Sequence, residues 1–120
     1  MGKYILAIAA FSILCCGISI GGPAPAKPTF ASVDPILKQR CVGCHHGEKA
    51  AHGLDLSSYA SVIKGDKEGK VVIAGKAATS RLSISVHHGK GSAAMPPGPS
   101  ALKPADVAKI DAWIAGGASK

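Results

Sequence analysis

The stretch ILKQRCVGCHHGEKA occupies residues 36–50 and holds the densest group of potential ligands in the chain. Cys41 and Cys44 are separated by two residues, and His45 follows the second cysteine directly. A further histidine, His46, comes next. Three kinds of site use such residues: a zinc site, a redox-active dithiol and a covalent attachment site for haem. The rest of the sequence must decide among them.

The N-terminal residues 1–26 are expected to be an export signal and not part of the fold. Lys3 provides one early positive charge, and an apolar run without acids or bases follows over residues 5–20. This run is short for a bilayer span, which needs about 20 apolar residues. Small residues follow at 24–26, so cleavage before Lys27 is expected. An uncleaved membrane anchor is the alternative.

Two cysteines lie inside this predicted signal. Lipidation of Cys15 or Cys16 would tether the protein, but a lipidation site requires a small residue before the cysteine, and Leu14 stands there instead. Removal of the signal therefore leaves Cys41 and Cys44 as the cysteines of the mature chain.

The chain of 120 residues is long enough for one domain. Its formal net charge is +7, and removal of residues 1–26 takes away one lysine and leaves +6. The charges are scattered, and aromatic residues are few. This pattern does not indicate nucleic-acid binding; the charge is interpreted first as solvation and second as favouring encounter with protein partners that have acidic surfaces. Membrane association is expected only if the signal or a lipid anchor is retained.

A linker is expected over residues 27–32, followed by one domain over residues 33–120. Order should begin at Ser32 or Asp34, with Asp34 as a helix cap and Pro35 at the first helical position. This helix would lead directly into the two cysteines.

Later elements are indicated by caps and periodicity. The run Leu54-Asp55-Leu56-Ser57-Ser58 provides a capped start for a helix that should end at Gly65. Its face would carry Tyr59, Val62 and Ile63. Residues 71–73 suggest a short extended segment, and the alternation of apolar residues and serines over 80–86 predicts a strand. The clearest helix begins at Pro104 and ends at Gly116-Gly117. Three or four short helices with long loops would form a poor core alone, so these loops are expected to wrap a ligand.

Haem attachment explains the cysteine motif best. Two residues between the thiols allow one helical turn to present both sulfurs to the vinyl groups of haem, with His45 beneath the iron. Zinc would need two further ligands, and a redox dithiol would need a βαβ setting that is absent. The histidines left to complete a zinc site lack finger spacing: His46, His52, His87 and His88. His46 is expected to face solvent.

Met95 is the expected ligand on the other face of the haem. Met1 leaves with the signal, and Met95 lies in a loop restricted by Pro96 and Pro97. The alternative ligand is His87 or His88, which would give a bis-histidine haem of lower potential.

Four segments resemble the planctomycete-type cytochrome c domain, and class I cytochrome c more broadly: RCVGCHHG, HGLDLSSYASVIKG, VVIAGKAATSRL and MPPGPSALKPADVAKIDAWIAGGA. The resemblance extends over about residues 33–118. It implies an all-α, cytochrome c-like fold of three to five short helices and long loops around one covalent haem c. It also implies iron ligation by His45 and Met95, a helix over residues 79–88 in place of the strand, and electron transfer outside the cytoplasm. Arg81 stands where it could reach a haem propionate, or it could be an ordinary surface arginine.

The first functional hypothesis is therefore a periplasmic or otherwise exported, possibly tethered, electron carrier and not an enzyme. No nucleophile–base pair or pair of carboxylates accompanies the motif. A haem peroxidase or gas sensor with a labile Met95, and a binding module of an exported complex, are the alternatives. The residues expected to line the haem pocket are apolar: Ile36, Leu37, Leu54, Leu56, Leu82, Val107, Ile110 and Trp113.

Overall fold

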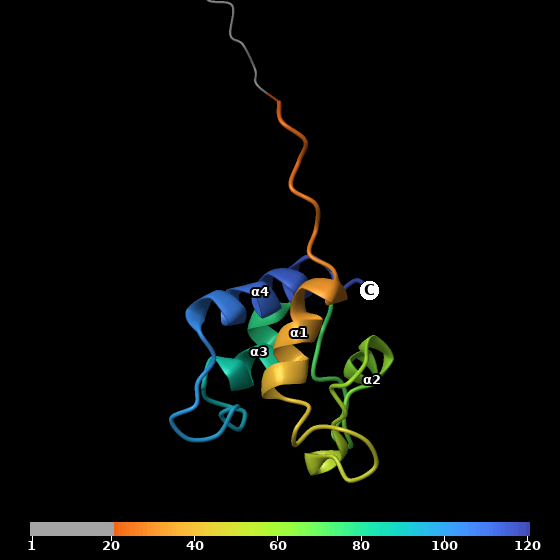
Figure 1. The fold of residues 1–120 in the computed structure, drawn as a ribbon, viewed down its shortest axis with the longest axis vertical. Helices are drawn as coiled ribbons and strands as arrows, with labels where there is room; N and C mark the ends of the chain where they lie inside the picture. Colours follow the sequence, from red (N-terminus) through yellow and green to blue (C-terminus); the bar gives the residue numbers. More distant parts are fainter. Residues whose placement is uncertain (1–20) are drawn as a thin grey trace, which may run out of the picture.

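The computed structural model describes residues 21–120 (Figure 1). Within this range the chain forms helices and no strand, which confirms the predicted all-α class. The elements are α1 (Phe30–Arg40), η1 (Ala51–Gly53), α2 (Tyr59–Lys64), η2 (Ala77–Thr79), α3 (Arg81–Val86) and α4 (Pro104–Ala115), where η denotes a 3-10 helix.

Residues 1–20, which hold Cys15, Cys16 and most of the predicted signal, lie outside the described residues. Residues 21–29 have no regular secondary structure and lead to the start of α1. No helix between residues 21 and 120 is both long enough and apolar enough to cross a bilayer.

Helix α1 begins earlier than predicted. It starts at Phe30, so Pro35 lies inside the helix and not at its first position, and the helix includes the last residues of the expected linker. The packing of Phe30 explains why α1 starts earlier than predicted. Phe30 is buried, with its ring edge-on to Tyr59 at a centroid distance of 5.5 Å and tilted at 5.7 Å from Trp113. These contacts favour an ordered turn before Pro35 although the proline cannot donate its backbone hydrogen bond.

The core lies where α1 packs against α4 (Figure 1). Leu37 of α1 and Trp113 of α4 are completely buried, as are Ile110 and Ile114. The carbonyl oxygen of Ser119 accepts hydrogen bonds from the backbone N–H of Phe30 and from Nε1 of Trp113, both at 2.8 Å. The segment after α4 is thereby joined to the start of α1.

Helix α2 has the ends predicted from its sequence. The hydroxyl of Ser58 accepts the backbone N–H of Ser61 at 3.2 Å, and Gly65 ends the helix. Gly65 has φ +85°, and a Cβ there would collide with the carbonyl of Gly69. Only glycine permits this close approach, which shapes the turn over residues 65–69.

Residues 71–80 form an irregular segment that is buried at its two ends and mostly exposed between them. Val71 and Val72 are buried, and the carbonyl of Val71 accepts the N–H of Leu82 at 2.9 Å. The fully buried hydroxyl of Ser80 accepts the N–H of Ile73 and donates to the carbonyl of Lys76, both at 2.8 Å. Side-chain hydrogen bonds here satisfy backbone groups that a sheet would otherwise pair.

Residues 81–86 form helix α3 and not the strand that their alternation predicted. Leu82 and Val86 are four residues apart and both buried, as on one helical face. The serines between them are not the exposed face of a strand, because Ser83 and Ser85 are also buried. The family resemblance implied a helix over residues 79–88, and it predicted this segment better than the alternation of apolar residues and serines did.

Phe30→Ala should lower the free energy of unfolding by about 3 kcal/mol, because it leaves a cavity between Tyr59 and Trp113. Urea denaturation followed by far-ultraviolet circular dichroism would measure the loss. Ile73→Ala is the control: this side chain is 38% exposed, so its truncation should cost below about 1 kcal/mol. Equal losses for the two variants would contradict the assigned role of Phe30.

Candidate functional site

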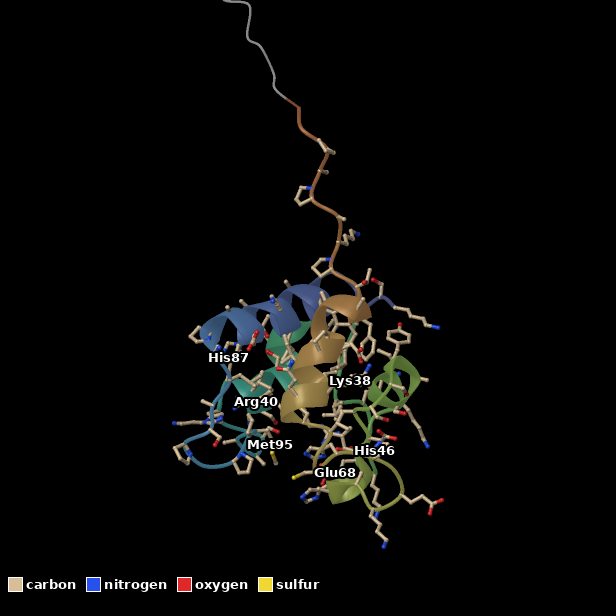
Figure 2. All side chains as sticks on the ribbon, viewed as in Figure 1. Lys38, Arg40, His46, Glu68, His87 and Met95 are labelled. Carbon is tan, nitrogen blue, oxygen red and sulfur yellow. The ribbon has the colours of Figure 1, made fainter. Side chains whose placement is uncertain are left out.

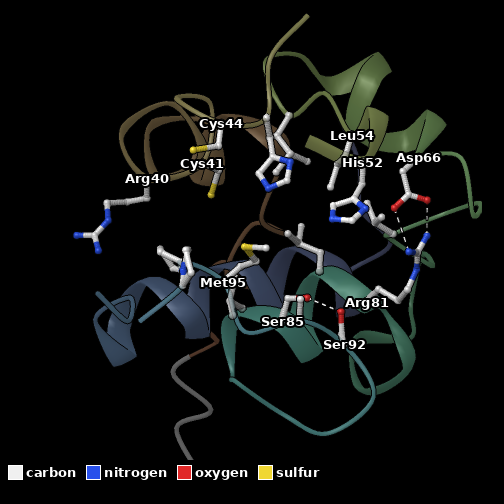
Figure 3. A pocket seen from close by; sticks show the side chains of 18 of the residues that line it. Arg40, Cys41, Cys44, His52, Leu54, Asp66, Arg81, Ser85, Ser92 and Met95 are labelled. Atoms are coloured by element: carbon white, nitrogen blue, oxygen red, sulfur yellow. Dashed lines mark hydrogen bonds and ion pairs between the residues drawn. The ribbon is translucent and has the colours of Figure 1, made fainter. Parts of the chain in front are cut away.

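A cavity of about 310 Å³ lies at the end of the domain where the long loops meet, within the size range of ligand sites. Its walls come from the end of α1, from η1 and the residues after it, from α3 and from the Met95 loop. The lining residues are Arg40, Cys41, Cys44, His45, His52, Leu54, Leu56, Asp66, Glu68, Val71, Arg81, Leu82, Ser85, Val86, Gly91, Ser92, Ala93, Met95, Pro96 and Pro97. Figure 3 shows Cys41, Cys44 and Met95 at one end and His52, Asp66 and Arg81 at the other.

The expected apolar pocket was partly wrong. Leu54, Leu56 and Leu82 line the cavity, but the other five expected residues do not. Those five belong to the buried core: Ile36, Leu37, Val107, Ile110 and Trp113. Their helices pack against one another, and this contact removes their apolar faces from the cavity.

The cysteine motif forms a helical turn that continues α1. The N–H of Cys41 donates to the carbonyl of Leu37 at 2.9 Å, and the carbonyl of Cys41 accepts from Cys44 at 3.2 Å and from His45 at 3.0 Å. The carbonyl of His45 accepts the N–H of Leu56 at 2.9 Å. The two cysteines and the histidine therefore reach one cavity from a single turn.

The imidazole of His45 is buried and is not used to hold the fold. Its side chain lines the cavity, and Nδ1 has no hydrogen-bond partner among the described residues. A buried polar atom without a partner costs free energy, so it calls for an explanation. A ring held ready for a ligand provides one, and this fits the donor set expected for haem.

The Cys41 thiol does not resemble that of a redox-active cysteine. Burial raises the pKa of the Cys41 thiol to about 11, and nearby Arg40 only partly offsets this. A redox-active cysteine needs a lowered pKa, because the thiolate is the nucleophile. Among residues 21–120, no three side chains of His, Cys, Asp or Glu are grouped to hold a metal ion.

Met95 reaches the same cavity from the loop after α3. Its side chain is half-buried, and its backbone N–H donates to the carbonyl of Ser85 at 2.9 Å. Pro96 and Pro97 follow it and also line the cavity. A nitrogen ligand from His45 and a sulfur ligand from Met95 are thus both available to one bound group.

The remaining histidines differ in position. The side chain of His46 is 65% exposed, as expected. His87 and His88 do not line the cavity; Nε2 of His87 lies 2.6 Å from Oδ2 of Asp111 on α4, apart from Met95 in Figure 2. His52 does line the cavity, a position that nothing in its local sequence signalled.

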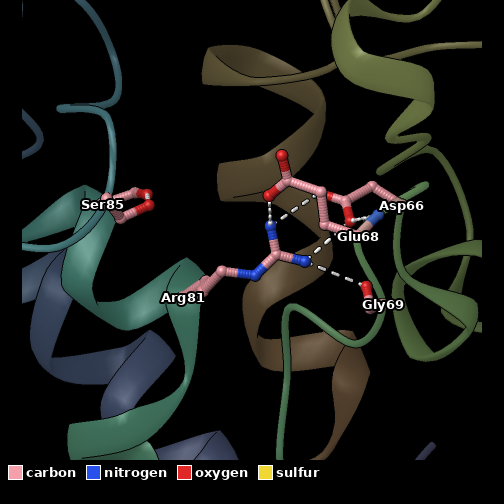
Figure 4. Close-up of polar contacts among 6 residues, drawn as sticks. Asp66, Glu68, Gly69, Arg81 and Ser85 are labelled. Atoms are coloured by element: carbon pink, nitrogen blue, oxygen red, sulfur yellow. Dashed lines mark hydrogen bonds and ion pairs between the residues drawn. The ribbon is translucent and has the colours of Figure 1, made fainter.

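Arg81 is bound to carboxylates at the far end of the cavity (Figure 4). Its guanidinium donates to Asp66 Oδ1 at 2.7 Å and Oδ2 at 3.0 Å, to Glu68 Oε2 at 3.0 Å and to the carbonyl of Gly69 at 3.0 Å. The hydrogen bond from Arg81 is the main reason why the pKa of Asp66 is lowered. Arg81 is thus engaged by Asp66, Glu68 and Gly69 in this structure, and its contact with a haem propionate stays a prediction.

Residues 41–99 match the protein family described as Planctomycete cytochrome C. The matched range includes every residue of the cavity lining except Arg40. It is narrower than the resemblance drawn from the sequence, since α1 and α4 lie outside it. No curated protein and no solved structure significantly matches the chain.

Asp66→Asn should destabilise the protein by about 1 kcal/mol at pH 7, because it removes the charged partner of Arg81 at the surface of the cavity. The folded-state pKa of Asp66 is lowered, so its contribution is complete above the usual value of 3.8 and is lost as the pH falls through the lower folded value. Urea denaturation at pH 7 and below pH 3.8 should show the difference from the unmodified protein shrinking in acid.

Glu68→Gln is the matched control, since Glu68 binds the same arginine with a side chain that is 78% exposed. Glu68→Gln should lower the free energy of unfolding by less than about 0.5 kcal/mol. An Asp66→Asn effect that stays constant across this pH range would contradict the role given to the ion pair.

Proposed function

Residues 41–99 belong to the Planctomycete cytochrome C family, and on this premise we propose that the protein is an exported electron carrier with one haem attached through Cys41 and Cys44. A cytochrome c domain implies covalent haem and haem-based electron transfer. One observation carries the assignment of residues: Cys41, Cys44, His45 and Met95 all line the same cavity.

The residues that line the cavity would have different roles in holding the haem. Cys41 and Cys44 would hold the haem through thioether bonds to their sulfurs. His45 would offer an imidazole nitrogen to the iron, and Met95 would offer its thioether sulfur. The bound haem supplies an iron that alternates between ferric and ferrous states. A methionine opposite a histidine gives a higher reduction potential than two histidines do.

The exposure of the cysteines supports electron exchange at the protein surface. Cys44 is exposed and Cys41 is half-buried, so the attachment edge would lie next to solvent. Buried apolar side chains also line the cavity, including Leu56, Val71 and Leu82. These exclude water from the interior of the site, while the cysteine edge remains open to a redox partner.

A carrier fits the polar groups of the cavity better than an enzyme does. Asp66 and Glu68 are engaged by Arg81, and the hydroxyl of Ser85 is bonded to Ser92 and not to a base. Members of the family are typically electron carriers. Neither a peroxidase nor a gas-sensor role has a specific observation in its favour.

The proposed function also includes export, a monomeric state and partners with acidic surfaces. Residues 1–26 have the sequence of an export signal, and the cytochrome c family is usually exported. We propose that the mature protein is a monomer and that its net positive charge favours partners with acidic surfaces.

The purified holoprotein should retain haem after extraction with acidified acetone, because two thioether bonds hold it. In the reduced state its visible spectrum should not change under CO, since Met95 occupies the remaining position on the iron. Met95→Ala should open this position, alter the spectrum and allow CO to bind. CO binding by the unmodified protein would contradict the carrier assignment.

Two histidine variants serve as controls for the ligand assignment. His52→Asn tests the histidine that shares the cavity, and His88→Asn tests the rival ligand from the sequence. Both residues have positive φ, 57° and 54°, and asparagine tolerates this conformation. Both variants should keep the spectrum of the unmodified protein. In either one, the altered spectrum and CO binding expected of Met95→Ala would overturn the choice of Met95.

Oxidation of the reduced protein by ferricyanide, an anion, should slow as ionic strength rises, because salt screens the attraction of the positive protein. A cationic cobalt complex is the control oxidant, and its rate should rise under the same conditions. Stopped-flow absorption measures both rates. Equal salt dependence for the two oxidants would exclude steering by the positive surface.

A further inference from the structure

The loop that carries Met95 is tied to a single residue of α3. The carbonyl of Ser85 accepts the N–H of Met95 at 2.9 Å. The hydroxyl of the same serine lies 2.6 Å from the hydroxyl of Ser92, which comes three residues before Met95. Both serines line the cavity beside Met95 (Figure 3). Ser85 therefore holds this loop at two points.

These two bonds join the loop to the buried face of α3. Ser85 is 9% exposed, and the contact between the hydroxyls has the length of a good O–H···O hydrogen bond. Ala93 and Ala94 lie between Ser92 and Met95. Both are exposed, so they bury little surface. Without the hydroxyl bond, the loop before Met95 would regain conformational freedom that opposes a fixed position of its sulfur.

We propose that Ser85 and Ser92 are positioning residues for Met95, and that their hydroxyl bond sets how readily an outside ligand displaces the methionine sulfur from the iron. This inference rests on the proposed function, because it takes Met95 as the ligand. The serines act through the loop; neither is assigned contact with the iron.

Ser85→Ala and Ser92→Ala should each raise the affinity of the oxidised holoprotein for imidazole by about three- to tenfold, the factor that one hydrogen bond is worth. Imidazole is the probe because it competes with a thioether for ferric haem, and the visible spectrum reports its binding. Ser92→Thr keeps a hydroxyl and should keep the affinity of the unmodified protein.

A double variant tests whether the two serines act through one bond. Because either single change already breaks the hydroxyl contact, S85A/S92A should bind imidazole no more tightly than the more affected single variant. Independent, multiplying effects would contradict a shared bond.

Ser83→Ala is the matched control. Ser83 lies on the same helix and is also buried, but its hydroxyl donates to Oδ1 of Asp111 at 2.6 Å, away from the Met95 loop. Ser83→Ala should lower the free energy of unfolding in urea about as much as Ser85→Ala does, without changing the affinity for imidazole. Equal increases of imidazole affinity in Ser83→Ala and Ser85→Ala would show a general loosening of the fold and overturn the proposal.

Met95→Ala distinguishes failure of the positioning role of the serines from failure of the ligand role of Met95. If this variant alters the spectrum while the Ser85 and Ser92 variants bind imidazole as the unmodified protein does, the positioning role alone is wrong. If Met95→Ala leaves the spectrum unchanged, Met95 is not a ligand and the proposed function fails with it.

Discussion

The carbonyl oxygen of Cys41 accepts the backbone N–H groups of Cys44 and His45, and this pair of hydrogen bonds determines where both sulfurs and the imidazole lie. The turn is a continuation of α1, whose Leu37 is completely buried against the core. The opposite wall of the cavity belongs to α3, which Ser83 connects to Asp111 of α4. Helix α1 and helix α3 both pack on α4, so this helix sets the separation of the two walls without lining the cavity itself.

The domain consists of two parts with different sources of stability. At one end, helices bury aromatic and aliphatic side chains in the usual way, with Trp113 at the centre. At the other end, long loops depend on individual polar contacts such as those of Ser80, Ser85 and Arg81. A group that binds only the folded state would add to the stability of these loops.

Features that depend on local chemistry were predictable from the sequence. The spacing of Cys41, Cys44 and His45 predicted a shared turn, and Ser58 and Pro104 marked the starts of helices correctly. These signals work because a cap or a proline acts on its own neighbours.

Features that depend on distant partners were not predictable in this way. Packing of Phe30 against Trp113 extended α1 past Pro35, and burial of Ser83 and Ser85 made a helix look like a strand. The cavity lining was also misjudged, because the sequence does not show that Val107 and Trp113 face α1 while Val71 and Arg81 reach the site. Met95 and its prolines could be selected for their chemistry, but their tie to Ser85 depends on the fold.

The carbonyl of Ser119 joins the two ends of the domain, since it receives the N–H of Phe30. The chain thus enters and leaves the domain at one side, while the long loops lie at the opposite side (Figure 1). Anything fused before Phe30 or after Ser119, whether a membrane tether, a solid support or a second protein, would emerge far from the cysteine edge. Immobilisation through either end would leave that edge pointing outward, an orientation suited to a surface-bound relay.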